Sequence, residues 1–264
     1  NSVIVEEERT NLAHLRDYNR EGFVPNIYSA PSQDDQDLEQ LLDNIRPDEE
    51  YEEEGLQQTP VELSIQLLKH QRVGLSWLIR MEELRLKGGL LADDMGLGKT
   101  VQAISLIVAR KSPENMPTLV VAPVSLLHQW KGEIQQKIRK LCALKVAIYH
   151  SSSKSKFKTW ADLSAYDVII SSYGMVTLEY KKHFKEFIRA IDRNSRLGNG
   201  NIPGIEDGGI SYASPLFSSG NKFFRILLDE SQIIKNKNTV VSRAVFLLQA
   251  EHRFCLSGTP IQNN

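Results

Sequence analysis

The stretch "GGLLADDMGLGKTVQAI", residues 88–104, decides the fold. It joins a short apolar run to a helical pattern through a turn that ends in Gly98, Lys99 and Thr100. A strand, a turn whose backbone N–H groups face inward and a helix N-terminus together form a cradle for phosphate. The pattern G-x-x-x-x-G-K-[ST] would place glycine at position 93, where this chain has aspartate. The stretch therefore predicts a phosphate loop with one unusual residue.

Each part of this loop has an expected role. Lys99 would reach the β- and γ-phosphates of a nucleotide, and Thr100 would give its hydroxyl to Mg²⁺. The alternative is a glycine-containing turn before a helix that binds no nucleotide, with Lys99 on the surface. If the loop is functional, its nucleotide-binding residues are Asp94, Met95, Gly96, Leu97, Gly98, Lys99 and Thr100.

A second motif with defined chemistry is "FRILLDESQIIKN", residues 224–236. An apolar run ends in two adjacent carboxylates, and the carboxyl edge of a parallel sheet faces the ligand crevice. Asp229 would hold Mg²⁺ through its water shell, and Glu230 would orient or deprotonate the attacking water. A solvated acidic pair at a strand end is the alternative, but a phosphate loop upstream in the same domain favours catalysis. The predicted catalytic residues are Lys99, Asp229 and Glu230.

Apolar runs and amphipathic stretches alternate through most of the chain. Helical spacing is expected from Val61 to Ile79, over 100–110 and again over 126–138. Strand and helix in alternation predict an α/β fold with a mostly parallel central sheet covered on both faces. The Gly/Ser-rich residues 192–222 predict a flexible insertion. Buried strands are expected at Gly89–Ala92, Leu119–Ala122, Val146–Tyr149, Val168–Ser171, Ile226–Leu228 and Phe254–Leu256.

Charge divides the chain into two parts. Residues 1–60 contain 16 acidic and 4 basic side chains, a balance of −12, whereas residues 61–264 contain 17 acidic and 28 basic ones, a balance of +11. We expect an acidic N-terminal extension over 1–60, followed by one large domain over 61–264 that suits a polyanion. We also expect that the extension, by covering that domain, restrains its binding to a polyanion.

Several classes of protein are disfavoured by the composition. No run approaches the roughly 18 apolar residues that would span a bilayer, so no membrane partner is expected. The two cysteines, Cys142 and Cys255, lie far apart and give neither zinc-ligand spacing nor a disulfide framework. A soluble intracellular protein is the expectation.

The order of the motifs resembles the first motor lobe of the Swi/Snf family of DNA translocases, in helicase superfamily two. The resemblance spans Leu63 to Asn264 and implies a RecA-like three-layer fold. In this family an acidic residue stands where other phosphate loops have their first glycine, so Asp93 marks the lineage. The matching segments are "LLKHQRVGLSWL", "GLLADDMGLGKT", "LVVAPVSLLHQW", "DVIISSYG", "ILLDESQIIKN" and "LSGTPIQNN".

The resemblance assigns roles residue by residue. It makes Gln71 the reader of adenine, and it places a DNA strand along Pro123, Ser125 and His128 and along Ser172 and Tyr173. Trp130, at helical spacing with Leu126 and Ile134, is expected in the core rather than as a base-stacking platform. Ser231 is slightly larger than the residue the family usually has there. The residues expected to couple nucleotide to DNA are Ser257, Gly258 and Thr259.

The resemblance also implies an activity. It indicates a nuclear, DNA-stimulated ATPase that uses ATP and Mg²⁺ and moves along duplex DNA to remodel or evict bound proteins. The family forms its ATP site between two lobes, and the second lobe is expected to be absent from this chain, which would then be nearly inactive alone. Two alternatives stay open: another phosphate-loop enzyme such as a small-molecule kinase, and a non-enzymatic interaction module with a vestigial nucleotide site.

Within the family, the insertion and the "DESQ" and "KNKNT" segments most resemble the fungal translocases linked to SUMO-targeted ubiquitin ligation. The post-replication-repair translocases that carry a RING insertion are the near alternative. In view of this resemblance, "SVIVEEE", residues 2–8, is similar to a SUMO-interacting motif. Val3, Ile4 and Val5 would add a strand to a sheet edge of SUMO, and Glu6–Glu8 would face basic side chains.

Overall fold

The computed structural model describes residues 55–196, 213–218 and 220–258. All of these belong to one compact unit, Glu53–Asn264, which is separate from the unit Asn1–Glu52. The expected SUMO-binding residues Val3, Ile4 and Val5, most of the acidic extension and Thr259 lie outside the described residues.

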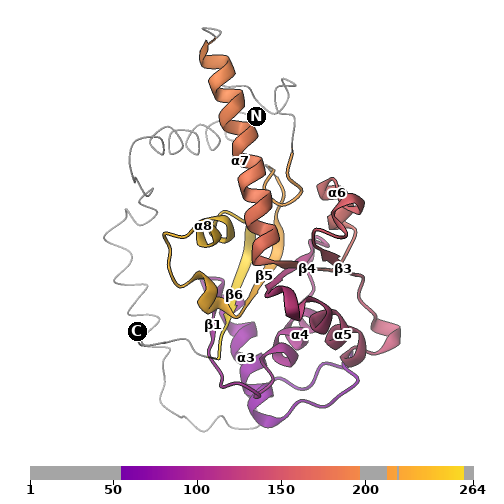
Figure 1. The fold of residues 1–264 in the computed structure, drawn as a ribbon. Helices are drawn as coiled ribbons and strands as arrows, with labels where there is room; N and C mark the ends of the chain where they lie inside the picture. Colours follow the sequence, from indigo (N-terminus) through magenta and orange to yellow (C-terminus); the bar gives the residue numbers. More distant parts are fainter. Residues whose placement is uncertain (1–54, 197–212, 219, 259–264) are drawn as a thin grey trace. The chain divides into compact units, whose positions relative to one another are not determined.

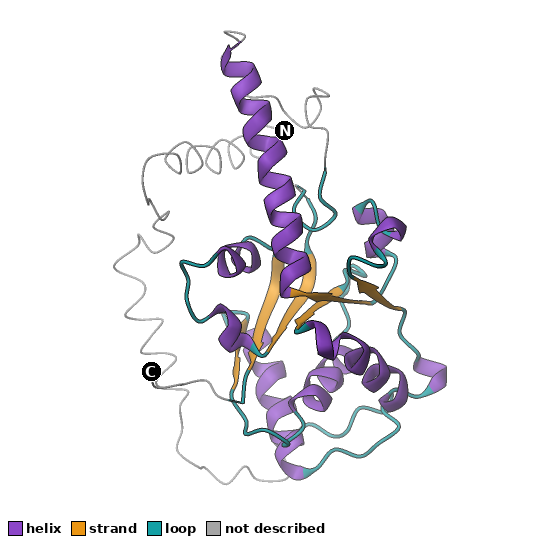
Figure 2. Cartoon of the chain, viewed as in Figure 1, coloured by secondary structure: helices purple, strands orange, loops and turns teal. Residues whose placement is uncertain are grey.

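The centre of the domain is a six-stranded sheet in the order β1-β6-β5-β2-β4-β3 (Figures 1 and 2). Every paired neighbour in it runs parallel. Side chains of the central strands are buried on both faces, which is why their sequences read as continuous apolar runs rather than alternating ones. All six predicted strands are present: β1 Gly88–Leu91, β2 Thr118–Ala122, β3 Val146–Tyr149, β4 Val168–Ser172, β5 Phe223–Asp229 and β6 Ala250–Leu256.

Helices cover both faces of the sheet, so the expected three-layer RecA-like α/β fold is confirmed. One buried cluster joins one sheet face to α3 Lys69–Glu83, α4 Lys99–Ala109 and α5 Leu127–Lys137. A second cluster joins the other face to α6 Trp160–Ser164, α7 Tyr173–Arg196 and α8 Val240–Phe246 (Figure 1). Short 3-10 turns lie at Val124–Leu126, Lys140–Cys142, Lys154–Lys156 and Ser231–Ile234.

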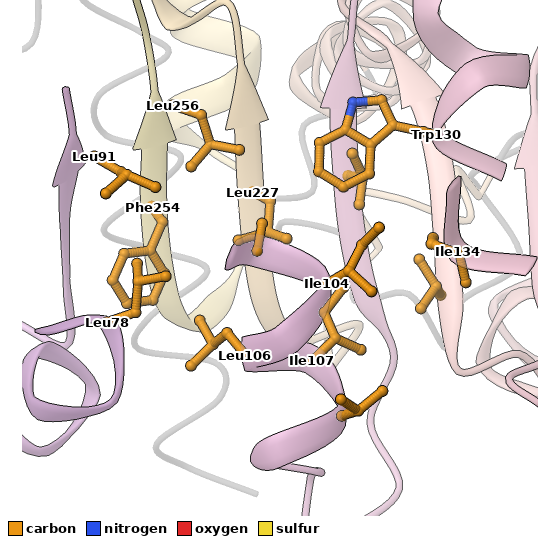
Figure 3. Packing of buried hydrophobic residues seen from close by; sticks show 14 of the residues in the cluster. Leu78, Leu91, Ile104, Leu106, Ile107, Trp130, Ile134, Leu227, Phe254 and Leu256 are labelled. Atoms are coloured by element: carbon orange, nitrogen blue, oxygen red, sulfur yellow. The ribbon is translucent and has the colours of Figure 1, made fainter. Parts of the chain in front are cut away.

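The first core cluster carries the helices that bear the site. Ile104 and Leu106 of α4 pack with Leu227 of β5, and Trp130 of α5 lies in the same cluster (Figure 3). Trp130 is 1% exposed, as expected for a core residue. Burying each such large apolar side chain stabilises the fold by about 1.5–3 kcal/mol, so α4 and α5 are held firmly against the sheet.

Two sequence-based boundaries need correction. The helix expected from Val61 begins only at Lys69, because Leu63 instead forms an isolated antiparallel bridge with Ile138. Of the residues expected in a flexible insertion, 192–196 continue α7 and Ser214 is buried, whereas 197–212 lie outside the described residues. The Ser214 hydroxyl donates to the buried Glu179 carboxylate at 2.9 Å, which ties residue 214 to α7. Among the described helices, none has the length and apolar composition of a membrane span.

Candidate nucleotide site

Three neighbouring strands bring the predicted motifs to one edge of the sheet. Leu256 of β6 lies opposite Leu91 of β1 on one side and opposite Asp229 of β5 on the other. Parallel strands lie about 4.8 Å apart, so the ends of β1 and β5 are separated by only about 10 Å. The phosphate loop follows Leu91, the acidic pair ends β5, and the coupling segment follows Leu256. The sheet topology therefore places all three at one edge of the sheet, where parallel α/β folds commonly have their ligand crevice.

The phosphate loop has the backbone conformation expected of an anion cradle. Gly96 and Gly98 have φ angles of 91° and 84°, which favour glycine because it lacks a Cβ atom. Helix α4 begins at Lys99 and its N-cap Gly98 has no side chain to bond the first N–H groups, which leaves them for an anion. The Lys99 ammonium donates to the carbonyls of Asp93 at 2.7 Å and Asp94 at 3.0 Å. To reach phosphates, it must exchange these carbonyls for them.

Asp93 has a structural partner that the sequence did not predict. The side-chain amide of Gln102, on α4, donates to the Asp93 carboxylate at 2.8 Å. Gln102 is fully buried, whereas Asp93 is half-buried at the start of the loop. The aspartate therefore anchors the loop to the first turns of α4, a role that glycine could not fill.

Gln71, the predicted adenine reader, lies against the phosphate loop. Its side chain accepts from the Leu68 N–H at 3.1 Å and donates to the Leu97 carbonyl at 3.3 Å. A Cβ atom at Gly98 would come within 2.5 Å of the Gln71 amide nitrogen, so the two residues are in close contact. His70 Nε2 also bonds to the Leu97 carbonyl, at 3.1 Å, a contact that sequence reasoning missed. Both side chains link α3 to the nucleotide loop.

The Asp229 carboxylate is fixed at both oxygens. The Trp130 indole N–H donates to Oδ2 at 2.7 Å, and the Glu230 backbone N–H donates to Oδ1 at 3.0 Å. Burial raises the pKa of Asp229, while the indole hydrogen bond and the nearby Lys99 charge oppose that rise. The Lys99 ammonium thus lies near enough to the Asp229 carboxylate to favour its charged form.

Glu230 is joined to the coupling segment by a chain of side chains. The Gln232 amide donates to the Glu230 carboxylate at 2.6 Å, and the Ser257 hydroxyl donates to the Gln232 carbonyl oxygen at 3.0 Å. Glu230 itself has a left-handed backbone with φ of 52°, which is uncommon for a residue with a side chain. Backbone strain of this kind is often found where a side chain must be aimed at a site.

Gly258 completes the crevice against the phosphate loop. A Cβ atom at Gly258 would come within 2.6 Å of the Met95 side chain and 3.6 Å of the Lys99 ammonium. The coupling segment therefore lies against the phosphate loop at Met95, near the Lys99 ammonium. Thr259, the third predicted coupling residue, lies outside the described residues.

The segments predicted to contact DNA lie at the same sheet edge, since Ala122 of β2 pairs with Ser172 of β4. Ser125 and His128 are exposed and Pro123 is half-buried, so this first segment is accessible. The second needs correction. Ser172 and Tyr173 are 2% and 5% exposed, which leaves neither side chain free for a phosphate.

The hydroxyls of the second segment are used inside the protein. Ser172 Oγ accepts from the Met175 N–H at 3.1 Å, which satisfies a donor at the start of α7. Tyr173 donates to the Asp229 backbone carbonyl at 2.7 Å, and burial raises the pKa of Tyr173, so the hydroxyl keeps its proton. Periodicity could not show that these hydroxyls point inward.

The residues at the crevice fit a magnesium nucleotide. Asp229 offers a half-buried carboxylate, and Thr100 offers a half-buried hydroxyl in the first turn of α4. Mg²⁺ at phosphate sites takes one or two protein ligands and fills its shell with phosphate and water. In the part of the chain that the structure describes, no cluster of three or more His, Cys, Asp or Glu side chains forms an all-protein metal site. The donor set thus suits Mg²⁺ carried by a nucleotide.

Fold and site together define a RecA-like nucleotide-binding lobe, and comparison with known proteins gives its family. The model of the SNF2-related domain matches residues 70–264. The chain belongs to this family of ATPases, whose relatives include ATP-dependent helicases.

Individual relatives agree with this assignment. The chain is 40% identical over 262 residues to the ATP-dependent helicase ULS1 of Saccharomyces cerevisiae, covering 98% of this chain and 16% of that protein. It is 32% identical to the DNA repair protein rad5 of Emericella nidulans, covering 69% of this chain and 15% of that one. The chain thus spans about a sixth of the length of these relatives.

A solved structure shares the fold. The Sulfolobus solfataricus SWI2/SNF2 ATPase core in complex with dsDNA is 30% identical, with a TM-score of 0.54, over 78% of this chain and 34% of that one. The Swi/Snf resemblance read from the sequence is confirmed by the family match and by this structure.

Proposed function

We propose that the full-length protein is a DNA-stimulated ATPase that moves along duplex DNA and remodels or evicts bound proteins in the nucleus. The observation that carries the proposal is the meeting of Lys99, the acidic pair and Gly258 at one sheet edge. The solved relative bound to dsDNA and the exposed segment with Ser125 and His128 support duplex DNA as the partner.

The described residues divide the chemistry among them. The α4 N-terminus and Lys99 bind the phosphates, and Thr100 and Asp229 would hold Mg²⁺. When bound, that ion would neutralise charge on the transferring phosphoryl group. Glu230 orients the attacking water and accepts its proton, aimed by Gln232 and Ser257. Because Gly258 lies against Met95 and near the Lys99 ammonium, the segment after β6 can respond to changes in the phosphate loop.

We further propose that the 264-residue chain alone hydrolyses ATP slowly. Enzymes of this class complete the site with an arginine from a second motor lobe, which contributes about 10³-fold or more in rate. SUMO or SUMO-modified proteins are proposed as partners through Val3, Ile4 and Val5, on the sequence pattern alone. Titrating a peptide of residues 1–10 with SUMO and finding no chemical-shift change at millimolar concentration would remove that partner.

The test is an ATPase assay on the full-length protein with and without duplex DNA, beside Lys99→Ala and Glu230→Gln. We expect DNA to raise turnover severalfold or more in the wild type, and Glu230→Gln to bind nucleotide but lose about 10²–10⁴ in rate. Turnover by the wild type that DNA does not change would contradict the translocase. A Lys99→Ala protein with full function in cells would instead support an interaction module with a vestigial site.

A further inference from the structure

Asp229 is the point where two segments flanking the crevice converge. Trp130, on α5, donates to its carboxylate, and Tyr173, at the start of α7, donates to its backbone carbonyl, each at 2.7 Å. Both donors are buried, at 1% and 5% exposure, so water does not compete for these bonds. Asp229 is thus hydrogen-bonded at both its side chain and its backbone by residues distant in the sequence.

Each of these donors lies in or directly beside a segment at the carboxyl edge of the sheet that was predicted to contact DNA. Trp130 follows the exposed His128 within the first turn of α5, and the exposed Ser125 lies in the 3-10 turn just before that helix. Its ring packs among the core residues while its indole nitrogen lies toward the crevice end of the sheet (Figure 3). Tyr173 directly follows β4, whose last residue pairs with Ala122, just before the exposed segment. A small shift of α5 would therefore carry the indole with it.

Core packing alone does not account for these partners. A buried indole N–H needs an acceptor, but any backbone carbonyl would satisfy it. Here the acceptor is the carboxylate expected to hold Mg²⁺ through its water shell, and Mg²⁺ demands near-ideal octahedral geometry of the waters and phosphates around it. A shift of the Asp229 carboxylate would move the acceptor of those waters and so change how well magnesium-bound nucleotide is held.

We infer that Trp130 and Tyr173 are positioning residues that transmit the docking of DNA along α5 and the β4–α7 junction to Asp229. The inference rests on the proposed function, because it requires duplex DNA and ATP to bind the same lobe. DNA bound against the exposed side of α5 holds Trp130 and Tyr173 in the arrangement that presents Asp229 to the ion. Linkage requires the reverse as well: magnesium-bound nucleotide tightens DNA binding by the same factor.

The experiment measures this coupling by binding rather than by turnover. In the full-length protein, the affinity for a non-hydrolysable ATP analogue with Mg²⁺ is titrated with and without saturating duplex DNA. We compare wild type, Trp130→Phe and Tyr173→Phe, which remove the two donors while keeping an aromatic ring. Trp77→Phe is the matched control, since Trp77 packs against Phe254 in the same core cluster.

The expected result is a DNA-dependent gain in analogue affinity of about 5–150-fold in the wild type. In Trp130→Phe and Tyr173→Phe that gain falls at least fivefold, while Trp77→Phe keeps it within about twofold. If DNA raises the analogue affinity of the wild type and raises that of Trp130→Phe and Tyr173→Phe by the same factor, the inference is overturned. The proposed function would then still stand. A wild type that shows no gain and no DNA-stimulated turnover defeats the proposed function itself. If Trp130→Phe does not fold, Tyr173→Phe, which loses a single hydroxyl, decides the matter.

Discussion

The buried side-chain amide of Gln102 donates to the carboxylate of Asp93 at 2.8 Å, and this bond joins the phosphate loop to α4. Asp93 occupies the position where other phosphate loops have glycine. Aspartate lacks the conformational freedom of glycine, but here it accepts a hydrogen bond that glycine could not. A hydrogen bond to a carboxylate is stronger than one between two neutral groups.

Changing Asp93 to glycine, which restores the common pattern, should therefore destabilise this protein. The substitution leaves the Gln102 amide buried without its acceptor, at a cost of about 1–3 kcal/mol in the free energy of unfolding. Urea denaturation of the 264-residue chain measures it. Asp93→Asn, which keeps an acceptor oxygen, should lose less. Equal stability of Asp93→Gly and wild type would show that the bond contributes nothing.

Gln232 and Ser257 should act as one unit in hydrolysis. The Gln232 side chain connects the Ser257 hydroxyl to the Glu230 carboxylate. Gln232→Ala and Ser257→Ala should therefore each leave the Glu230 carboxylate less well oriented as the general base. We expect each change to slow DNA-stimulated turnover about tenfold, and the double variant to be little slower than either alone. Gln249→Ala, an exposed glutamine beside β6, is the control and should keep wild-type turnover. If the two losses in turnover multiply in the double variant, Gln232 and Ser257 act independently of each other.

DNA should approach the exposed start of α5. Placing a carboxylate at His128 repels phosphate, so His128→Glu should weaken binding of the full-length protein to duplex DNA about five- to tenfold at low salt. The difference should shrink as salt is raised, because screening weakens the repulsion. Gln135→Glu adds the same charge at an exposed position farther along α5 and should have a smaller effect. Equal losses at both positions would mean that the repulsion is not local to the crevice.

A buried ion pair closes the opposite end of the sheet. The fully buried Arg225 donates to Glu82 at 2.5 Å and to the Arg110 carbonyl at 3.2 Å. Arg225→Met leaves the buried Glu82 carboxylate with only the half-exposed Arg110 as an ionic partner, at 3.3 Å, and we expect a loss of up to about 3–5 kcal/mol in the free energy of unfolding. Glu82→Met with Arg225→Met removes both charges and should recover much of that loss. Urea denaturation of the single and double variants decides between charge and simple packing.

The sequence was sufficient for the sheet because its strands are buried on both faces. Runs such as the one ending at Ala122 are apolar without interruption, and the phosphate loop and acidic pair stand directly after their strands. These features are encoded locally, within a few residues of each motif. The strand order was not predicted; the structure supplies it and places Leu256 between Leu91 and Asp229.

Contacts between distant side chains could not be predicted in this way. No local spacing connects Trp130 to Asp229, and a tyrosine after a strand gives no sign that its hydroxyl turns inward. For that reason the sequence did not show that the Tyr173 hydroxyl, expected beside a DNA strand, is bonded inside the protein. The expected start of the first helix at Val61 was wrong because Leu63 forms a bridge with Ile138, a tertiary pairing that overrides local periodicity, and the helix begins at Lys69.

The central claim is that the Lys99 amine and the Asp229–Glu230 pair serve a single magnesium-bound triphosphate. A crystal structure of this chain with Mg²⁺ and a non-hydrolysable ATP analogue tests it most directly. We predict that the Lys99 ammonium leaves the carbonyls of Asp93 and Asp94 for the β- and γ-phosphates, with Thr100 and Asp229 facing one ion. Phosphates bound away from the α4 N-terminus, or an ion beyond the reach of Asp229 and its water shell, would contradict the account.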